Sequence, residues 1–370
     1  MIKTEFCDLV GIKYPIIQAG MGPFGTNKLS IATANAGILG LISSSGIATK
    51  EYQPGVYKHF VETGGASLED DERTIMKKIY RQTLDGTREK QGVFGINVMV
   101  SAEMREPAEM IIDTMIEARE EDPEMKERFK VLVSSAGDPL PWTDKVKKAG
   151  LIWMHVMPSV KAALRCQKAG VDVVIASGHE GGFHTSWEPV HSMVLLPAVV
   201  DALSGSGIFV VGAGGFCDGK SLAAALALGA SGAQMGTRFL ATKESDFVQM
   251  WKESVVKAGD RGTLVARGFV GPARWLKTPR SLKHQEDTIK MSPGVFLGRP
   301  DDYSTIPMDL IINELEGINA TYTGDEEKAL MAGGESAQRV NDMPAVGEVI
   351  ERIVRQTEEI IENLPKRVLV

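Results

Sequence analysis

The chain has 370 residues, of which 43% are hydrophobic and 24% are charged, and its formal net charge is −7. This length suits an α/β barrel with an extension, and the acidic balance argues against nucleic acid as a partner. The three widely spaced cysteines predict neither a disulfide framework nor a zinc site, and the lack of a signal-peptide pattern or of a ~20-residue apolar run predicts a cytoplasmic protein with no membrane association.

Eight short apolar runs predict β-strands, and a helical segment follows each of them. Eight such βα units in about 250 residues predict a TIM (β/α)8 barrel. A doubly wound sheet is the alternative, but no G-x-G-x-x-G fingerprint follows the first strand. The predicted strands are Tyr14–Gln18, Leu39–Ser43, Val93–Val100, Lys130–Ser134, Leu151–Val156, Val171–Ala176, Ile208–Val211 and Gly232–Met235.

The connection after the second strand is longer than an ordinary βα crossover. Residues Ile47–Gln91 therefore predict an inserted segment over the barrel mouth together with the second helix. The acidic run LEDDER within it, Leu68–Arg73, is interpreted as a solvated helix start, where carboxylates are favoured. The other predicted barrel helices are Asn27–Asn35, Ala108–Glu120, Trp142–Ala149, Ser159–Ala169 and Lys220–Leu228.

The pattern changes after about Ser245, so we divide the chain into a barrel, residues 1–245, and a C-terminal extension, residues 246–370. The extension is predicted to be a mainly helical lid subdomain packed on the barrel. Its segment Gly262–Gly298 is expected to be extended chain across the barrel mouth, with its basic residues on a solvated surface or, alternatively, against an anionic coenzyme tail. Its predicted helices are Asp246–Lys257, Ile306–Glu316, Glu326–Met331 and Gly347–Glu362.

Glycine-rich loops follow the seventh and eighth strands, at Gly212–Gly215 and Gly236–Arg238. In a TIM barrel these two loops often bind phosphate, because they present free backbone N–H groups. The small residues of Ala19–Gly22 would let a flat ligand approach the backbone, although a tight turn is the alternative. Asn97, within an apolar strand, could read the edge of a ring or cap a neighbouring loop.

His184 ends the glycine-rich loop after the sixth strand, at the face where barrel active sites form. Histidine titrates near neutral pH, which suits a general base. His179 and Phe183 in the same loop are candidate substrate contacts, and a structural role for His179 is the alternative. A metal site is not predicted, since no fourth ligand accompanies His179, Glu180 and His184.

Five motifs carry a resemblance to a known family: PIIQAGMG, GINVMV, AGVDVVIASGHEGGFH, VVGAGGFCDG and GAQMGTRF. Because the five motifs occur in this order, residues 14–240 resemble the nitronate monooxygenases (2-nitropropane dioxygenases) and the related flavin-dependent enoyl-acyl-carrier-protein reductases. The resemblance implies a TIM barrel that binds FMN non-covalently and places His184 beside the substrate. The residues that it implies for FMN are Ala19, Gly20 and Met21 at the ring, Asn97 at the ring heteroatoms, Ser177 and Gly181 against the cofactor, and Gly214, Gly215, Gly236 and Thr237 at the phosphate.

The resemblance implies an FMN-dependent oxidoreductase, first a nitronate monooxygenase that oxidises alkyl nitronates or nitroalkanes with O2. An NAD(P)H-dependent reductase of enoyl thioesters or quinones is the alternative, favoured by Val156 and by Pro158–Val160. A non-catalytic flavin-binding barrel is a third reading. The substrate is expected to be a small molecule, and the sequence leaves a homodimer open.

Overall fold

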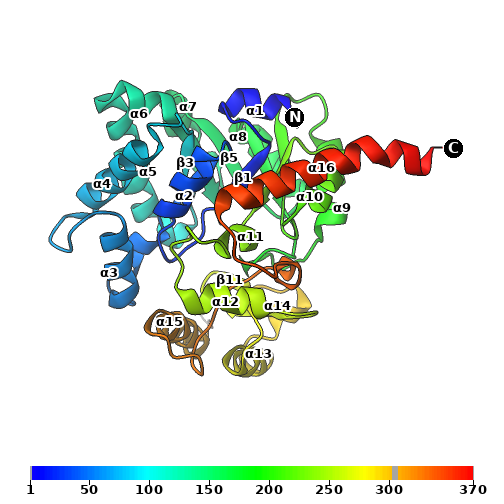
Figure 1. Ribbon diagram of the computed structural model, residues 1–370. Helices are drawn as coiled ribbons and strands as arrows, with labels where there is room; N and C mark the ends of the chain where they lie inside the picture. Colours follow the sequence, from blue (N-terminus) through cyan, green and yellow to red (C-terminus); the bar gives the residue numbers. More distant parts are fainter. Residues whose placement is uncertain (1, 302–306, 370) are drawn as a thin grey trace.

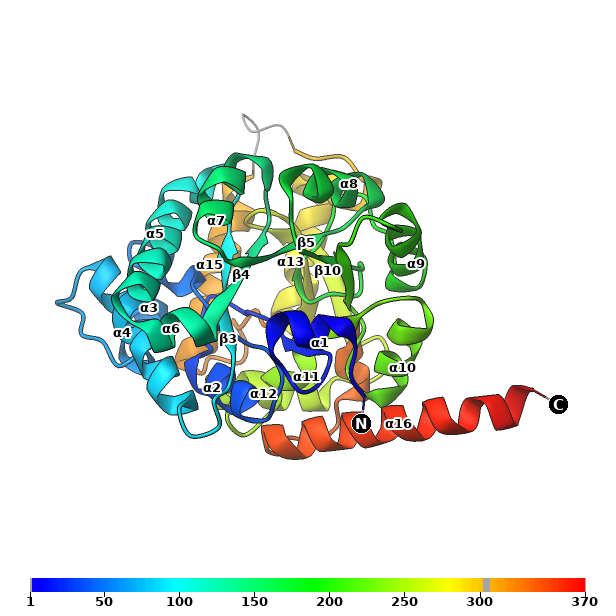
Figure 2. The same cartoon turned by 90° about the horizontal axis from the view of Figure 1, so that it is seen from above.

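A computed structural model describes residues 2–301 and 307–369 of the chain (Figure 1). Eight parallel strands form one sheet in the order β1-β9-β8-β6-β5-β4-β3-β2, and a bridge between Ile17 and Leu39 joins its two edges. Helices surround this sheet (Figure 2), which confirms the predicted TIM barrel. The barrel strands are β1 (Ile16–Gln18), β2 (Gly40–Ser43), β3 (Phe94–Met99), β4 (Phe129–Ser135), β5 (Ile152–Met157), β6 (Val173–Ser177), β8 (Phe209–Ala213) and β9 (Gly232–Met235).

The helices of the barrel begin and end at local signals in the sequence. Asp71 accepts a hydrogen bond from the backbone N–H of Thr74, which explains why the acidic run stands at the start of α4. Ser159 caps α8 in the same way, and Gly170 ends that helix in the left-handed conformation. The helices of this part are α1 (Glu5–Val10), α2 (Asn27–Asn35), α3 (Pro54–Thr63), α4 (Glu72–Thr87), α5 (Arg105–Glu121), α6 (Pro123–Arg128), α7 (Thr143–Lys148), α8 (Val160–Ala169), α9 (Ser192–Ala202), α10 (Gly219–Ala227) and α11 (Thr237–Leu240).

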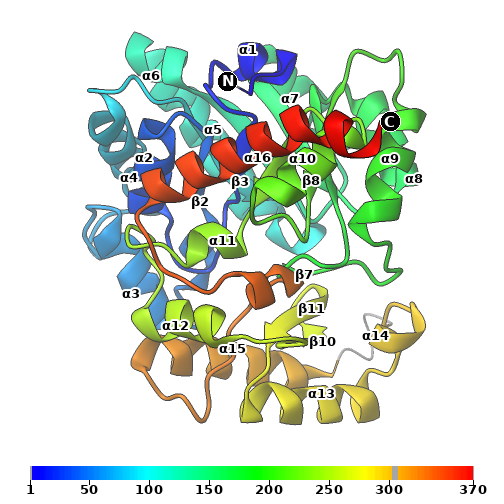
Figure 3. The same ribbon diagram turned by 45° about the vertical axis from the view of Figure 1, so that its right-hand side comes forward.

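The expectation of extended chain over Gly262–Gly298 is wrong. Strands β10 (Thr263–Gly268) and β11 (Gly271–Leu276) form an antiparallel hairpin there, and helices α13 (Pro279–Met291) and α14 (Gly294–Leu297) follow it. The hairpin forms because its apolar residues gain a partner strand from the barrel, the short β7 (Phe183–His184), which pairs with β11. Figure 3 shows this second sheet between the barrel and helices α13 and α15.

The basic residues of this segment were expected on a solvated surface, but two of its arginines are buried. Arg267 and Arg274 are only 3% and 5% exposed, respectively. Arg267 pairs with Asp301 at 2.7 Å, and Arg274 pairs with Glu335 at 3.0 Å. Burial without these carboxylates would be costly for either guanidinium.

The remaining C-terminal elements differ from the prediction in length and kind. Helix α15 (Met308–Thr323) is longer than expected, and the first residue of the predicted Ile306–Glu316 helix lies outside the described residues. The helix expected at Glu326–Met331 is absent; a turn covers residues 326–328, and residues 329–331 have no regular secondary structure. The other helices are α12 (Gln249–Lys257) and α16 (Val346–Val368).

The C-terminal elements return to the barrel at two places. Helix α16 packs along α10, and its buried residues join the core between the sheet and the outer helices (Figure 1). The Asp246 carboxylate accepts hydrogen bonds from the backbone N–H groups of Lys28 and Leu29, at 3.2 and 3.1 Å, and so caps α2. In the stretches 2–301 and 307–369, no helix has both the length and the apolar character needed to cross a membrane.

A buried acid stands behind the tip of the β10–β11 hairpin. Glu314 on α15 is 2% exposed, and its Oε2 has no hydrogen-bond partner among the residues that the structure describes. Burial raises the pKa of Glu314 to about 8, although a hydrogen bond from the Phe269 backbone and the charge of Arg267 oppose the shift. The carboxyl group is therefore mainly protonated at neutral pH.

We expect Glu314 to make the stability of the fold depend on pH. Because its folded pKa lies above the unfolded value, its stabilising contribution is complete below about pH 4.5 and is lost as the pH rises through about 8. Replacing Glu314 with Gln removes this ionisation, so the fall in unfolding free energy between about pH 5 and about pH 9 should shrink by on the order of 4 kcal/mol. Urea denaturation at several pH values measures this pH dependence of the unfolding free energy. Glu316→Gln, on the exposed side of the same helix, should keep the wild-type slope, and the same slope in Glu314→Gln would contradict the account.

Candidate active site

A cavity of about 590 Å³ opens at the carboxyl ends of the barrel strands. Its wall contains residues within or just after each of the eight barrel strands, with a roof from the second sheet. The size is that of an ordinary ligand or cofactor site. The thirteen residues predicted from the sequence all line it: Ala19, Gly20, Met21, Asn97, Ser177, His179, Gly181, Phe183, His184, Gly214, Gly215, Gly236 and Thr237.

One end of the cavity is a cradle of backbone groups. Gly214 and Gly215 follow β8 with φ values of 81° and 86°, in the left-handed region that favours glycine. A Cβ atom on Gly214 would lie 2.6 Å from the carbonyl oxygen of Gly178, so the turn has no room for a side chain. Beside it, Thr237 accepts a hydrogen bond from the Gly334 N–H at 3.0 Å, which leaves its hydroxyl hydrogen free to donate. This cradle suits a phosphate group.

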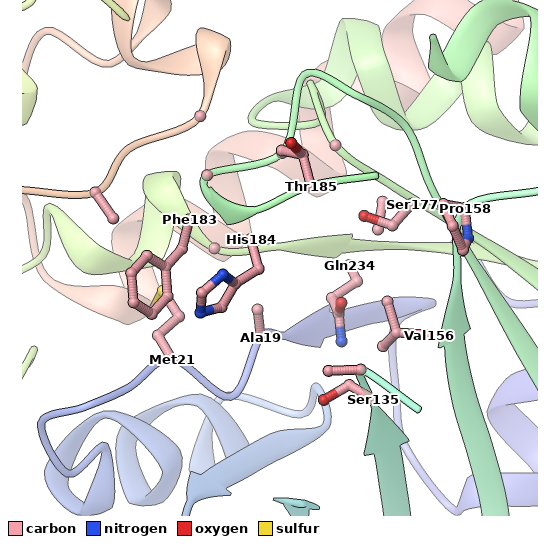
Figure 4. A pocket seen from close by; sticks show the side chains of 18 of the residues that line it. Ala19, Met21, Ser135, Val156, Pro158, Ser177, Phe183, His184, Thr185 and Gln234 are labelled. Atoms are coloured by element: carbon pink, nitrogen blue, oxygen red, sulfur yellow. The ribbon is translucent and has the colours of Figure 1, made fainter. Parts of the chain in front are cut away.

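Gly20 and Asn97 form a closely packed part of the cavity wall against which a flat ring could lie. A Cβ atom on Gly20 would lie 2.4 Å from Cβ of Asn97, so these two segments come as close as backbone and side chain allow. Asn97 Nδ2 lies 3.4 Å from both the Val133 carbonyl oxygen and Ser135 Oγ, at the long end of hydrogen bonding. Its amide is therefore held at the cavity wall. Figure 4 shows Ser135, Ser177 and Gln234 grouped at this part of the cavity, beside Ala19.

The C-terminal sheet positions the loop that carries His184. His184 and Phe183 pair with Ala273 and Arg274 of β11, and the Thr185 N–H donates to the Pro272 carbonyl oxygen at 2.8 Å. In a regular strand successive side chains point to opposite faces. Phe183 has a φ of 64°, which breaks this alternation and brings its ring to 4.2 Å from the ring of His184, measured between centroids. Such a conformation in a bulky residue is strained and typical of functional sites.

The His184 imidazole is neutral at physiological pH. Burial and, to a smaller extent, the positive charge of Arg267 together lower its pKa to about 4. Its Nδ1 is buried and has no hydrogen-bond partner within the described part of the chain. The expectation that this histidine titrates near neutral pH is therefore wrong. The ring points into the cavity, next to Met21 (Figure 4), with a lone pair or N–H available to a ligand.

His179 has a similar environment but a more structural setting. Burial, helped by the charges of Arg274 and His191, lowers its pKa to about 4. Its backbone oxygen accepts from the guanidinium of Arg274 at 2.9 and 3.2 Å, and its Nδ1 lacks a partner among the residues described. Arg274 thus ties the loop to the second sheet, and the imidazole remains available to a substrate.

The sequence analysis missed other residues that line the cavity. Gln234 is 9% exposed inside the apolar strand β9, the same pattern that drew attention to Asn97. Ser135 ends β4 before a glycine-containing turn, and Gly333 and Gly334 form a glycine pair in the C-terminal part. Each of these patterns is visible in the sequence. Trp187 also lines the cavity, but no local signal distinguishes it from a core residue.

Comparison with known proteins identifies the family of this barrel. The model of the nitronate monooxygenase family matches residues 3–356. A Rhodococcus jostii protein, (3aS,4S,5R,7aS)-5-hydroxy-7a-methyl-1-oxo-octahydro-1H-indene-4-carboxyl-CoA dehydrogenase, is 35% identical over 98% of each chain. A probable nitronate monooxygenase of Staphylococcus aureus is 26% identical over 97% of this chain and 99% of its own. The structure of FabK from Thermotoga maritima superposes with a TM-score of 0.76 at 28% identity, over 100% of both chains.

Proposed function

The chain belongs to the nitronate monooxygenase family, and from this premise we propose that it is an FMN-dependent oxidoreductase in which His184 removes a proton from an activated carbon of the substrate. One observation carries the proposal: the neutral imidazole of His184, whose Nδ1 has no hydrogen-bond partner among the described residues, faces a glycine-lined cavity at the mouth of the barrel. The family and the relatives make the protein an oxidoreductase, and a proton acceptor in this place could remove the proton that a substrate loses when it is oxidised.

The residues present fit FMN. Gly214, Gly215, Gly236 and Thr237 would hold the phosphate with backbone N–H groups and a hydroxyl, in a turn that a side chain would fill. Ala19, Gly20 and Met21 would lie against the ring, and Asn97 would meet its polar edge. Ser177 and Gly181 would complete the contact. When bound, FMN supplies a two-electron acceptor.

The low pKa of His184 is compatible with its role as a base. Burial and Arg267 disfavour an imidazolium in the free site, so the imidazole is ready to accept a proton at any pH above about 5. The proton arrives from a carbon that becomes negatively charged at the same moment. This nearby negative charge offsets both effects and stabilises the imidazolium while the substrate is bound.

Two substrate classes present such an acidic C–H bond. In a nitroalkane the nitro group acidifies the adjacent carbon, and the resulting nitronate would be oxidised with O2 as the final acceptor, as the family description suggests. In an acyl-CoA the thioester carbonyl does the same, as the name of the relative at 35% identity suggests. His179 and Phe183 would contact either substrate.

Anaerobic mixing of the purified yellow protein with single reductants tests the proposal. We expect propyl nitronate or a saturated acyl-CoA to bleach the flavin absorbance, with NADH added as a third arm. Bleaching by NADH alone would instead support an NAD(P)H-dependent reductase. A colourless protein that takes up no FMN would contradict the cofactor assignment and leave only a non-flavin barrel.

A further inference from the structure

Three apolar side chains line the roof of the cavity. Glycines, Asn97, Ser135 and Gln234 line the part attributed to the cofactor, whereas Phe183, Trp187 and Val270 line the roof. These three side chains come from the loop after β6 and from the tip of the β10–β11 hairpin. All three are half-buried, so they retain apolar surface that a ligand can cover.

Trp187 is held rigidly within this roof. The guanidinium of Arg267 lies 5.3 Å from the centre of its ring, at cation–π distance. Arg267 is fixed in turn by Asp301, whose carboxylate accepts from Ser292 Oγ at 2.8 and 2.9 Å. The backbone of Gly271 closes on the indole edge, since a Cβ atom there would lie 3.0 Å from Trp187 Nε1. The indole plane is therefore set before any ligand arrives.

Further apolar side chains are exposed on the hairpin tip and on the helix beside Trp187. Phe269 at the hairpin tip is 44% exposed, and Phe296 and Leu297 on α14 are 45% and 64% exposed. Helix α14 borders the same tryptophan, because a Cβ atom on Gly298 would lie 3.5 Å from the Trp187 carbonyl oxygen. Exposed apolar side chains are thus present on the hairpin tip and on the helix next to Trp187, outside the cavity.

From this arrangement we infer that the substrate carries a large apolar body, an alkyl chain or fused ring, that lies against a wall made of Phe183, Trp187 and Val270. A short nitroalkane would leave this wall in contact with water. The inference rests on the proposed function only in placing the reacting carbon beside His184. Among both nitroalkanes and acyl-CoA thioesters, the preferred substrates would be those with long or cyclic apolar groups that these three residues contact.

Isothermal titration calorimetry of the FMN-loaded protein with straight-chain carboxylates from propanoate to decanoate tests the wall directly. A carboxylate has the planar two-oxygen anion of a nitronate but is not oxidised by this route, so the readout is binding and not turnover. We expect Kd to fall about fourfold for each added methylene as the chain covers the wall. In a protein with Trp187 or Val270 replaced by Ala, Kd should fall less than about twofold for each added methylene.

The matched control is Tyr52→Ala, which removes an aromatic side chain that is 70% exposed and does not line the cavity. For this variant, Kd should fall by the same factor per added methylene as in the wild type. If Trp187→Ala does not fold, as judged by circular dichroism, Val270→Ala decides the question. Two results would overturn the inference: a Kd that is independent of chain length in the wild type, or a fall in Kd per methylene in the folded variants as large as that of the wild type. Failure of both nitronate and acyl-CoA to bleach the flavin would instead reject the proposed reaction, and the calorimetric result would remain readable.

Discussion

A His184→Ala protein should fold, remain yellow and lose most of its activity on a neutral nitroalkane, with a fall of roughly 10²–10⁴ in turnover, the range for a lost general base. The phosphate contacts are assigned to Gly214, Gly215, Gly236 and Thr237 and not to the His184 side chain, so flavin content should stay near that of the wild type. With a preformed nitronate the loss should be much smaller, because the proton has already left. Stopped-flow bleaching under anaerobic conditions measures both rates.

The matched control for this variant is His191→Ala. The His191 side chain is 56% exposed and does not line the cavity, although it stands near the same loop. Its replacement should leave both rates close to those of the wild type. Equal losses on nitroalkane and nitronate in His184→Ala would show that His184 orients the substrate, and unchanged rates on both would remove it from the mechanism.

A Gly236→Val protein should fold and be purified colourless, without bound FMN. A Cβ atom at this position would lie 3.3 Å from Sδ of Met21 and 3.6 Å from Cβ of Ala19, so the two branches of valine would enter the space attributed to the cofactor. The φ of Gly236 is −100°, which valine adopts without strain. Gly215→Val should also lose FMN, but the φ of 86° at Gly215 adds backbone strain to the steric effect.

Flavin content per chain, from absorbance after purification, and circular dichroism measure this outcome together. The control is Gly259→Val, because nothing lies within 4 Å of a Cβ atom there. It should remain yellow. Full flavin retention in folded Gly236→Val would show that the cofactor does not occupy this part of the cavity.

The barrel was predictable because each βα unit carries its own local signals. The apolar run predicted at Ile208–Val211, the glycines after it and the helical segment predicted at Lys220–Leu228 can be recognised without knowing their neighbours, and the structure has β8 and α10 there. Strands of this kind, buried on both faces, read as continuous apolar runs. The glycine loops stand directly at the strand ends, so the same signals located residues that line the cavity.

The second sheet was not predictable in this way. Strand β11 pairs with its neighbour β10 and also with β7, about ninety residues earlier in the chain, and no local pattern indicates that second partner. Arg267 and Arg274 read as surface residues because their partners, Asp301 and Glu335, are distant in sequence. The same distance hides the environment of His184, whose pKa depends on burial under this sheet and on Arg267.

The pH dependence of anaerobic flavin bleaching by a neutral nitroalkane tests the central claim most directly, that a neutral His184 accepts the proton. The account predicts a rate constant that is level from about pH 6 to about pH 8 and falls below about pH 5, as the imidazole becomes protonated near its pKa of about 4. In His184→Ala the remaining slow rate should lack this fall. A wild-type profile with its midpoint at the ordinary histidine value of 6.5 or above, or the same acid fall in His184→Ala, would contradict the assignment of His184 as the base.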